Sequence, residues 1–191
     1  MLLKSALSLV FLTAFMGTAF GADPTALVPI YKTNEPWPEL GFDVSTRQVP
    51  AIRFEPQEDI NLEYIQLWFM NNSSIYQGEV TITLNTDDLR EDGQSQPSDY
   101  ILESWTFQIS SQGLLQKDVI YSELKPYLEE GQRYWIVAQS ESPPLLNPVW
   151  NVSGPIGDDG VIGYYGRLDP LDGEWSVGSS AVPSIQIYGQ N

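Results

Sequence analysis

The sequence contains neither cysteine nor histidine. The lack of cysteine excludes a disulfide framework, so the fold must be held by apolar burial and strand pairing. The lack of both residues excludes a Ser-His-Asp triad, a Cys-His pair, a histidine general base and the usual zinc sites. What remains is carboxylate chemistry, cation binding through oxygen ligands, and non-covalent binding.

Positive charge is also scarce. The chain has 25 acidic residues against 9 basic ones, for a formal net charge of -16. The basic residues are scattered along the sequence rather than clustered. A field of this sign repels phosphate backbones and anionic lipid headgroups, so neither nucleic acid nor a membrane surface is an expected partner. The charge is also typical of a protein that must stay soluble outside the cell.

One long apolar run is present, at the N-terminus. It covers residues 6–15 after the single cationic Lys4, and Ala19 and Gly21 supply the small residues that a signal peptidase reads. The run is short for a membrane span. We expect residues 1–21 to be a signal peptide, the remaining chain to be secreted, extracellular or periplasmic, and no membrane insertion to follow cleavage.

The remaining chain, about 170 residues, has the length of one domain. Residues 22–49 are rich in proline and predict an N-terminal arm that packs across the domain or forms an edge strand, since proline cannot donate to a central ladder. Residues 50–191 show short runs in which apolar and polar side chains alternate, as in 80–84 and 105–109.

These runs predict an all-β fold, a single-domain antiparallel β-sandwich of jelly-roll or Greek-key type. The expected strands are 60–69, 78–87, 102–109, 119–124, 134–139, 149–152, 161–165 and 184–188. Between two of them, residues 125–130 are compatible with one turn of helix before Gly131.

A set of aromatic motifs carries a family resemblance. Residues 128–139 read Leu-Glu-Glu-Gly-Gln-Arg-Tyr-Trp-Ile-Val-Ala-Gln, Trp150-Asn151 follows, and Asp-Gly-Glu-Trp stands at 172–175. This spacing resembles the choice-of-anchor β-sandwich ectodomains of bacterial exoproteins. The resemblance implies an extracellular setting. Family members usually carry a C-terminal sorting tail, and since the sequence stops at Gln190-Asn191, soon after the last expected strand, we do not expect anchoring by that route.

Three acidic loops are candidates for a structural Ca²⁺ site, the one cofactor the sequence suggests: residues 85–93, 157–160 with Asp158 and Asp159, and 169–174. Carboxylate and carbonyl oxygens are the ligands that Ca²⁺ prefers. None of the loops has the EF-hand spacing, and Asp, Asn and Gly are equally typical of solvated turns. Both interpretations stay open.

Aromatic residues near loop ends are candidates for stacking on sugar rings, with acid and amide side chains binding the hydroxyls. The candidates are Trp150, Asn151, Tyr164, Tyr165, Asp172, Glu174 and Trp175. The alternative is that these rings fill the core of a small sandwich that lacks disulfides. The other strand tryptophans, Trp68, Trp105 and Trp135, are expected in the core.

Carboxylate catalysis has weaker support. A glycosidase needs two carboxylates on either side of a cleft. Glu63, Glu79 and Glu103 lie on expected strands, where each also fits the water-facing side of the alternation. We therefore expect no enzyme activity.

Three hypotheses remain. The first is a secreted, non-enzymatic β-sandwich that acts by surface interaction with the extracellular matrix, a cell surface or an environmental polymer. The second is a carbohydrate-binding module or carbohydrate-active enzyme on the same scaffold. The third is a periplasmic or spore-coat structural component. Extracellular polysaccharide and surface proteins are the expected partners.

Overall fold

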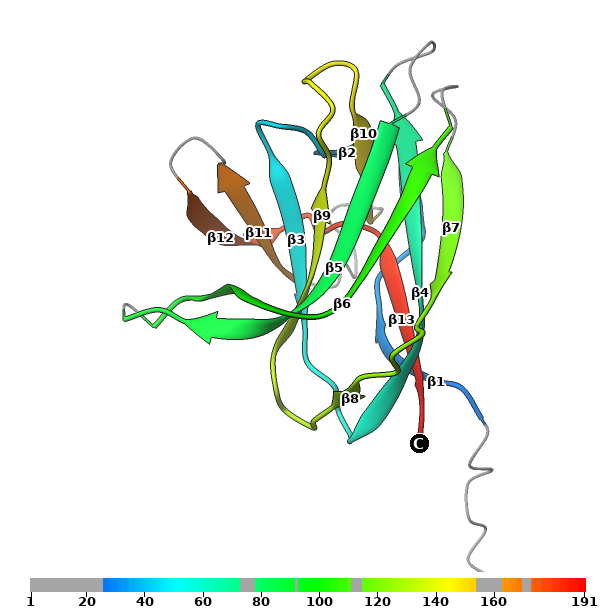
Figure 1. Cartoon of the computed structure of the whole chain (residues 1–191), viewed down its shortest axis with the longest axis vertical. Helices are drawn as coiled ribbons and strands as arrows, with labels where there is room; N and C mark the ends of the chain where they lie inside the picture. Colours follow the sequence, from blue (N-terminus) through cyan, green and yellow to red (C-terminus); the bar gives the residue numbers. More distant parts are fainter. Residues whose placement is uncertain (1–25, 73–77, 92, 111–114, 154–162, 170–172) are drawn as a thin grey trace, which may run out of the picture.

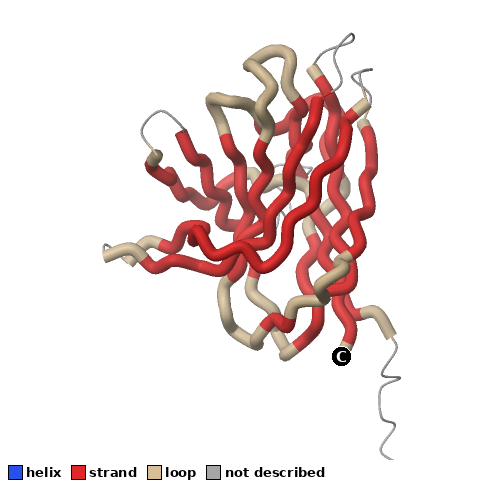
Figure 2. Tube along the Cα trace, viewed as in Figure 1, coloured by secondary structure: helices blue, strands red, loops and turns tan. Residues whose placement is uncertain are grey.

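The computed structural model describes residues 26–72, 78–91, 93–110, 115–153, 163–169 and 173–191. In these parts of the chain every regular element is a strand, as Figure 2 shows. The strands form two antiparallel sheets that do not close into a barrel. The predicted all-β sandwich is confirmed.

The first sheet is built around the long strand β4. One edge of β4 pairs with β13 and, further along, with β10, while its other edge pairs with β7 and β8. β1 extends the sheet beyond β13, and β2 extends it beyond β10. The strands are β1 (Val28–Lys32), β2 (Pro36–Asp43), β4 (Ile60–Asn71), β7 (Gln116–Tyr121), β8 (Tyr127–Leu128), β10 (Pro148–Ser153) and β13 (Ile185–Gln190).

The second sheet has the order β12-β11-β3-β9-β5-β6. Apart from two hairpins, β11–β12 and β5–β6, its neighbours come from distant parts of the sequence, so the chain crosses repeatedly between the sheets, as in Greek-key sandwiches. The strands are β3 (Val49–Phe54), β5 (Gly78–Leu89), β6 (Ser95–Ile109), β9 (Tyr134–Gln139), β11 (Gly163–Asp169) and β12 (Glu174–Ser180).

The proline-rich N-terminal segment lies at the outside of the first sheet, where a missing backbone donor costs little. Its residues 28–43 form β1 and β2, each paired on one side. Between these strands Thr33 is tied to β13, because its hydroxyl accepts a hydrogen bond from the Ile185 amide at 2.8 Å. The segment is thereby built into the sheet.

The core lies between the two sheets and follows the alternation seen in the sequence. Val80, Ile82 and Leu84 of β5 are fully buried against inward side chains of β4 such as Leu67 and Phe69. Burying each such side chain contributes roughly 1.5–3 kcal/mol. This buried apolar core stabilises the sandwich without disulfide bonds.

The outer face of the second sheet carries a smaller apolar cluster. Val49, Ala51, Trp135 and Val137 are buried there, with Trp175 of β12 packed against them. This face would lie in water in a simple sandwich. It is covered because neighbouring hairpins extend over it.

One of these hairpins is the arm, residues 85–101, in which β5 and β6 continue beyond the sheet (Figure 1). Register shifts between Leu84 and Asp87 mark the bend at which it departs from the sheet. The Asp87 carboxylate accepts hydrogen bonds from the Trp135 indole at 2.6 Å and from the Ser95 hydroxyl. These bonds hold the base of the arm against the outer face.

The prediction of a helical turn at residues 125–130 is wrong. Tyr127 and Leu128 form the short strand β8, paired with Asn61 and Ile60 of β4. Leu128 is fully buried, and an extended backbone is what brings its side chain into the core. Lys125 adopts the left-handed conformation, with a φ of 46°, which ends the preceding turn.

Candidate functional site

A surface groove lies on the open side of the sandwich, where the edge strands β6 and β7 of the two sheets run side by side (Figure 1). We call it the edge groove. Its volume is about 500 Å³. Its lining includes Glu103, Ser104, Trp105 and Thr106 of β6, Tyr121 at the end of β7, and Glu123 in the turn that follows β7.

Trp105 forms the inner wall of the edge groove. It is partly buried, because the alternation of β6 turns it toward the core at the edge of the sheet. Its indole N–H donates a hydrogen bond to the Tyr121 carbonyl oxygen at 3.1 Å. This bond links the edge strands of two different sheets. The sequence placed Trp105 in the core, whereas the structure places it at the rim of the core with a face in the groove.

Tyr121 forms the exposed wall. It is the last member of a row of three tyrosines on adjacent strands, with Tyr64 in the middle and Tyr188 at the other end. The centroid of the Tyr64 ring lies 4.6 Å from that of the Tyr188 ring and 5.8 Å from that of the Tyr121 ring. Tyr121 is 70% exposed. The row supports its ring from one side and leaves much of the ring open to solvent.

Glu103 fixes the turn that carries the rest of the groove. It is only 5% exposed. Its carboxylate accepts hydrogen bonds from the Ser122 hydroxyl at 2.5 Å and from the Glu123 and Leu124 amides at 2.7 and 3.2 Å. The expected water-facing position of Glu103 is wrong, because these donors at the start of the turn draw it inward.

The other two glutamates considered for catalysis lie elsewhere. Glu63 on β4 accepts hydrogen bonds from the Lys125 ammonium at 2.7 and 2.9 Å. Glu79 on β5 is exposed and accepts one from the Gln108 amide at 2.8 Å. Neither residue lines the edge groove with Glu103.

Trp150 and Asn151 lie inside the protein. The Trp150 indole is fully buried and stacks on Phe69, with ring centroids 5.8 Å apart. Its N–H donates to the Ser184 carbonyl oxygen at 3.0 Å, so the polar atom is satisfied without solvent. The buried Asn151 amide donates to the Trp37 carbonyl oxygen at 3.1 Å and holds β2 in place. A sugar on the surface has no access to either side chain.

The remaining aromatic candidates belong to the β11–β12 hairpin, in the other sheet. Trp175 pairs with Leu168 and is partly buried. It lies over Gly166, where an added Cβ would be 2.9 Å from the indole ring, so only glycine leaves room for this packing. Glu174 is an exposed residue at the start of β12.

Tyr165 is on β11, and its side chain, like that of Tyr164, lies outside the described residues, as does the whole of Asp172. The structure does not bring Trp150 and Trp175 together, because they belong to different sheets.

Two acidic side chains of residues 85–93 take part in hydrogen bonds within the protein. In the acidic segment 85–93, Asp87 is bonded to Trp135 and Ser95, and Asp88 accepts a hydrogen bond from Gln96 at 3.2 Å. Within the described parts of the chain no three acidic side chains gather around a common point that suits a metal ion. Asp158 and Asp159 lie outside those parts.

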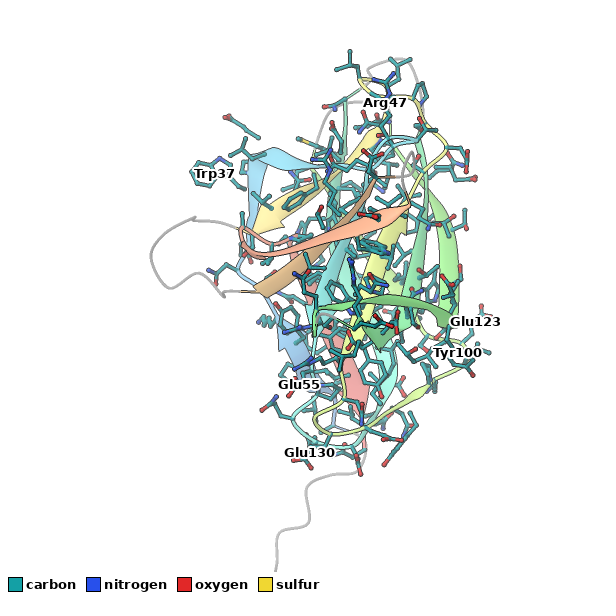
Figure 3. The ribbon with its side chains drawn as sticks, turned by 90° about the vertical axis from the view of Figure 1, so that its left-hand side faces the viewer. Trp37, Arg47, Glu55, Tyr100, Glu123 and Glu130 are labelled. Atoms are coloured by element: carbon teal, nitrogen blue, oxygen red, sulfur yellow. The ribbon has the colours of Figure 1, made fainter. Side chains whose placement is uncertain are left out.

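The edge groove was not found from the sequence because its walls come from β6 and β7, whose pairing partners lie in different sheets. One signal was present. The alternation of β7 leaves Val119 and Tyr121 on the outer side, and an outward tyrosine at the end of a strand is a candidate for contact. Trp37 is another exposed aromatic residue that was not singled out, and it projects from β2 in Figure 3.

The fold and the groove define an open antiparallel β-sandwich with an accessible aromatic site at its edge. Comparison with known protein families and with curated protein sequences finds no match to the chain. The resemblance to choice-of-anchor ectodomains stays a prediction. None of the described residues belongs to a helix that is long and apolar enough to cross a membrane.

Proposed function

We propose that this protein is a secreted, non-enzymatic β-sandwich that acts by binding an extracellular polymer, and that the edge groove holds a sugar ring of that polymer. The observation that carries the proposal is a groove of about 500 Å³ lined by two aromatic residues: Tyr121, which is 70% exposed, and Trp105, whose indole N–H donates to the Tyr121 carbonyl oxygen. That volume is within the usual range for small-ligand sites.

The side chains of the groove suit a carbohydrate. Aromatic rings provide apolar faces for the C–H faces of a sugar, and tyrosine and tryptophan add a polar end. Ser104 and Glu123 line the same groove and offer hydrogen bonds to sugar hydroxyls, whereas the Thr106 hydroxyl is hydrogen-bonded to that of Thr81 at 3.0 Å. The acidic side chain and the net charge of -16 favour a neutral or amine-bearing glycan over an acidic one at this site.

Binding is better supported than hydrolysis. A glycosidase needs one carboxyl group that is free to give a proton and a second that faces the same bond. In the edge groove both Glu103 oxygens are already hydrogen-bond acceptors for the turn. Burial raises the pKa of Asp118 on β7, but Asp118 does not line the groove.

The extracellular setting rests on the sequence. The apolar run with small residues before position 22 predicts export, and the motif resemblance to exoprotein ectodomains agrees with it. The excess of acidic residues suits a soluble protein in that setting.

Binding to polysaccharides tests the proposal. The purified protein is mixed with insoluble cellulose, chitin and xylan and with soluble neutral glycans, and the bound fraction is measured. We expect retention on at least one neutral glycan, and Tyr121→Ala should lower the affinity about tenfold through loss of the stacking ring. Tyr100→Ala is the matched control, because Tyr100 is 67% exposed but does not line the groove.

Two results would contradict the proposal. One is the absence of retention on every glycan together with specific capture of a surface protein, which would favour the protein-partner alternative. The other is retention that Tyr121→Ala and Tyr100→Ala reduce equally. A concentration-dependent assembly of the purified protein in sizing experiments would instead support a structural component.

A further inference from the structure

A second groove lies on the outer face of the second sheet, and we call it the arginine groove. Its volume is about 420 Å³. Arg53 of β3 and Arg133, directly before β9, line it from the sheet. The arm tip, residues 93–95, and residues 177–178 of β12 line it from the two hairpins.

The strand register brings the two arginines into this groove. Arg53 follows Val49 and Ala51 on the outward side of β3 and pairs with Trp135 of β9. Arg133 precedes that strand and therefore lies next to the same pair. The apolar cluster of this face ends at Ala51 and Trp135. The next outward positions on the two strands are the cationic side chains of Arg53 and Arg133.

The wall formed by the arm is held in place before any ligand arrives. Asp87 ties the base of the arm to Trp135. At the tip the Arg90 amide donates to the Gln94 carbonyl oxygen at 2.8 Å, and Gly93 has a φ of 80°, which favours glycine in this tight turn. An added Cβ at Gly93 would meet nothing within 4 Å, so the turn leaves space open beside the groove.

The charge of the groove is opposite to that of the molecule. Two of the 9 basic residues meet in it, in a chain with 25 acidic ones. Arg133 has Glu55 as an ion-pair partner at 3.8 Å, and the two side chains are 42% and 47% exposed. An exposed pair at this distance is weak. Since a guanidinium has five N–H donors, this contact through Nε leaves other donors of Arg133 for a ligand.

We propose that the arginine groove binds a ligand of sugar size that carries one carboxylate, such as a uronic acid. The planar guanidinium fork matches a carboxylate geometrically and makes charge-assisted hydrogen bonds to it. The volume accommodates one such ring. The net charge of -16 repels a densely charged polyanion, so the site takes an isolated carboxylate on an otherwise neutral ligand. The site is separate from the edge groove and does not depend on it.

Titration of the whole protein with glucuronic acid, followed by calorimetry or NMR at low salt, tests this proposal, with glucose and inorganic sulfate as separate arms. We expect glucuronic acid to bind, glucose not to bind at this groove, and sulfate to bind at least tenfold more weakly. Arg53→Gln and Arg133→Gln should each weaken glucuronic acid binding about tenfold, because each removes charge-assisted hydrogen bonds.

Two further variants sharpen the test. Arg47→Gln is the charge-matched control: Arg47 is exposed in the turn between β2 and β3, far from Glu55 in Figure 3, and its loss should leave binding unchanged. Glu55→Gln should tighten binding about two- to threefold, because it removes the carboxylate that competes for Arg133.

The proposal is overturned if glucuronic acid and glucose bind alike, or if sulfate binds as tightly as glucuronic acid, which would mean a general anion site. It is also overturned if Arg47→Gln weakens binding as much as Arg133→Gln. That result would mean that general electrostatic attraction, and not binding in the groove, holds the ligand. The Arg133 side chain is 42% exposed, so Arg133→Gln should fold normally and keeps the test valid even if Arg53→Gln destabilises the protein.

Discussion

The edge groove and the arginine groove are two concave regions that one β-sandwich forms by different means. The edge groove exists because the two sheets do not close, so that β6 and β7 face each other across an open side. The arginine groove exists because the arm and the β11–β12 hairpin rise over the outer face of a single sheet. One is aromatic with an acidic rim, and the other is cationic.

The two regions also differ in what holds their walls. In the edge groove a buried carboxylate, Glu103, collects donors from the turn that follows β7. In the arginine groove a carboxylate at the base of the arm, Asp87, binds the indole of Trp135. In each groove a carboxylate stabilises a wall through hydrogen bonds within the protein. The ligand would contact other side chains. The comparison leads to three predictions.

The largest effect is expected for Glu103→Ala. The change leaves the Ser122 hydroxyl and two backbone amides without their acceptor, and we expect the free energy of unfolding to fall by about 3 kcal/mol. Neutral glycan binding at the edge groove should be lost with the turn, while glucuronic acid binding persists. Urea denaturation measures the first effect, and the titrations above measure the others.

Glu79→Ala is the control for this change. Glu79 lies on the neighbouring strand, and the hydrogen bond that its carboxylate accepts from the Gln108 amide is exposed. We expect a loss of at most about 0.5 kcal/mol. Equal losses from the two variants would show that Glu103 is not the residue that holds the wall.

A smaller effect is expected for Asp87→Ala, which removes the carboxylate that holds the arm wall of the arginine groove. The loss of the bonds to Trp135 and Ser95 should lower the free energy of unfolding by about 1–2 kcal/mol. Hydrogen exchange of the arm amides should become faster, and glucuronic acid binding should weaken while glycan binding does not. Asp88→Ala, which removes an exposed hydrogen bond from Gln96, should change neither binding nor exchange at the base of the arm.

The smallest effect at neutral pH is expected for Tyr31→Phe, on the edge strand β1, where Tyr31 packs against the main core and lines neither groove. The Tyr31 hydroxyl is buried and has no hydrogen-bond partner in the described structure. Its loss should leave stability unchanged or raise it by at most about 1 kcal/mol at pH 7, and neither ligand should be affected. Loss of either binding function would mean that the grooves are coupled through the core.

The same variant has a distinct signature at high pH. Burial raises the pKa of Tyr31 from 10.0 to about 12. The unfolded chain loses this proton near pH 10 and the folded chain only near pH 12, so the folded state loses up to about 3 kcal/mol of stability across that window. The difference in unfolding free energy between wild type and Tyr31→Phe should shift by this amount between pH 10 and 12, and a constant difference would contradict the buried position.

The parts of the fold that depend on local pattern could be predicted. The alternation at 80–84 placed Val80, Ile82 and Leu84 in the core, and Pro29, Pro36 and Pro38 of β1 and β2 are where a sheet tolerates them, at its edges. The strand β12 was missed, because Asp172-Gly173 before it has turn composition and its own residues include small polar ones. The bend of the arm was also missed, because a bulge has no strong sequence signal.

The sites were harder to predict because they depend on which strands become neighbours. Trp150 is followed by an asparagine, which is typical of an aromatic residue at the end of a loop. In the structure its indole N–H donates to the Ser184 carbonyl oxygen inside the protein, so the ring is buried without leaving its polar atom unpaired. Arg53 and Arg133 are 80 positions apart, and only the pairing of β3 with β9 brings them together. No local pattern contains that information.

The most direct test of the account is a single set of titrations in which wild type, Tyr121→Ala and Arg133→Gln are each measured against a retained neutral glycan and against glucuronic acid. The account predicts that Tyr121→Ala loses the neutral glycan and keeps glucuronic acid, and that Arg133→Gln shows the reverse. If either variant loses both ligands, or if both variants keep both, the two grooves are not the independent binding sites described above.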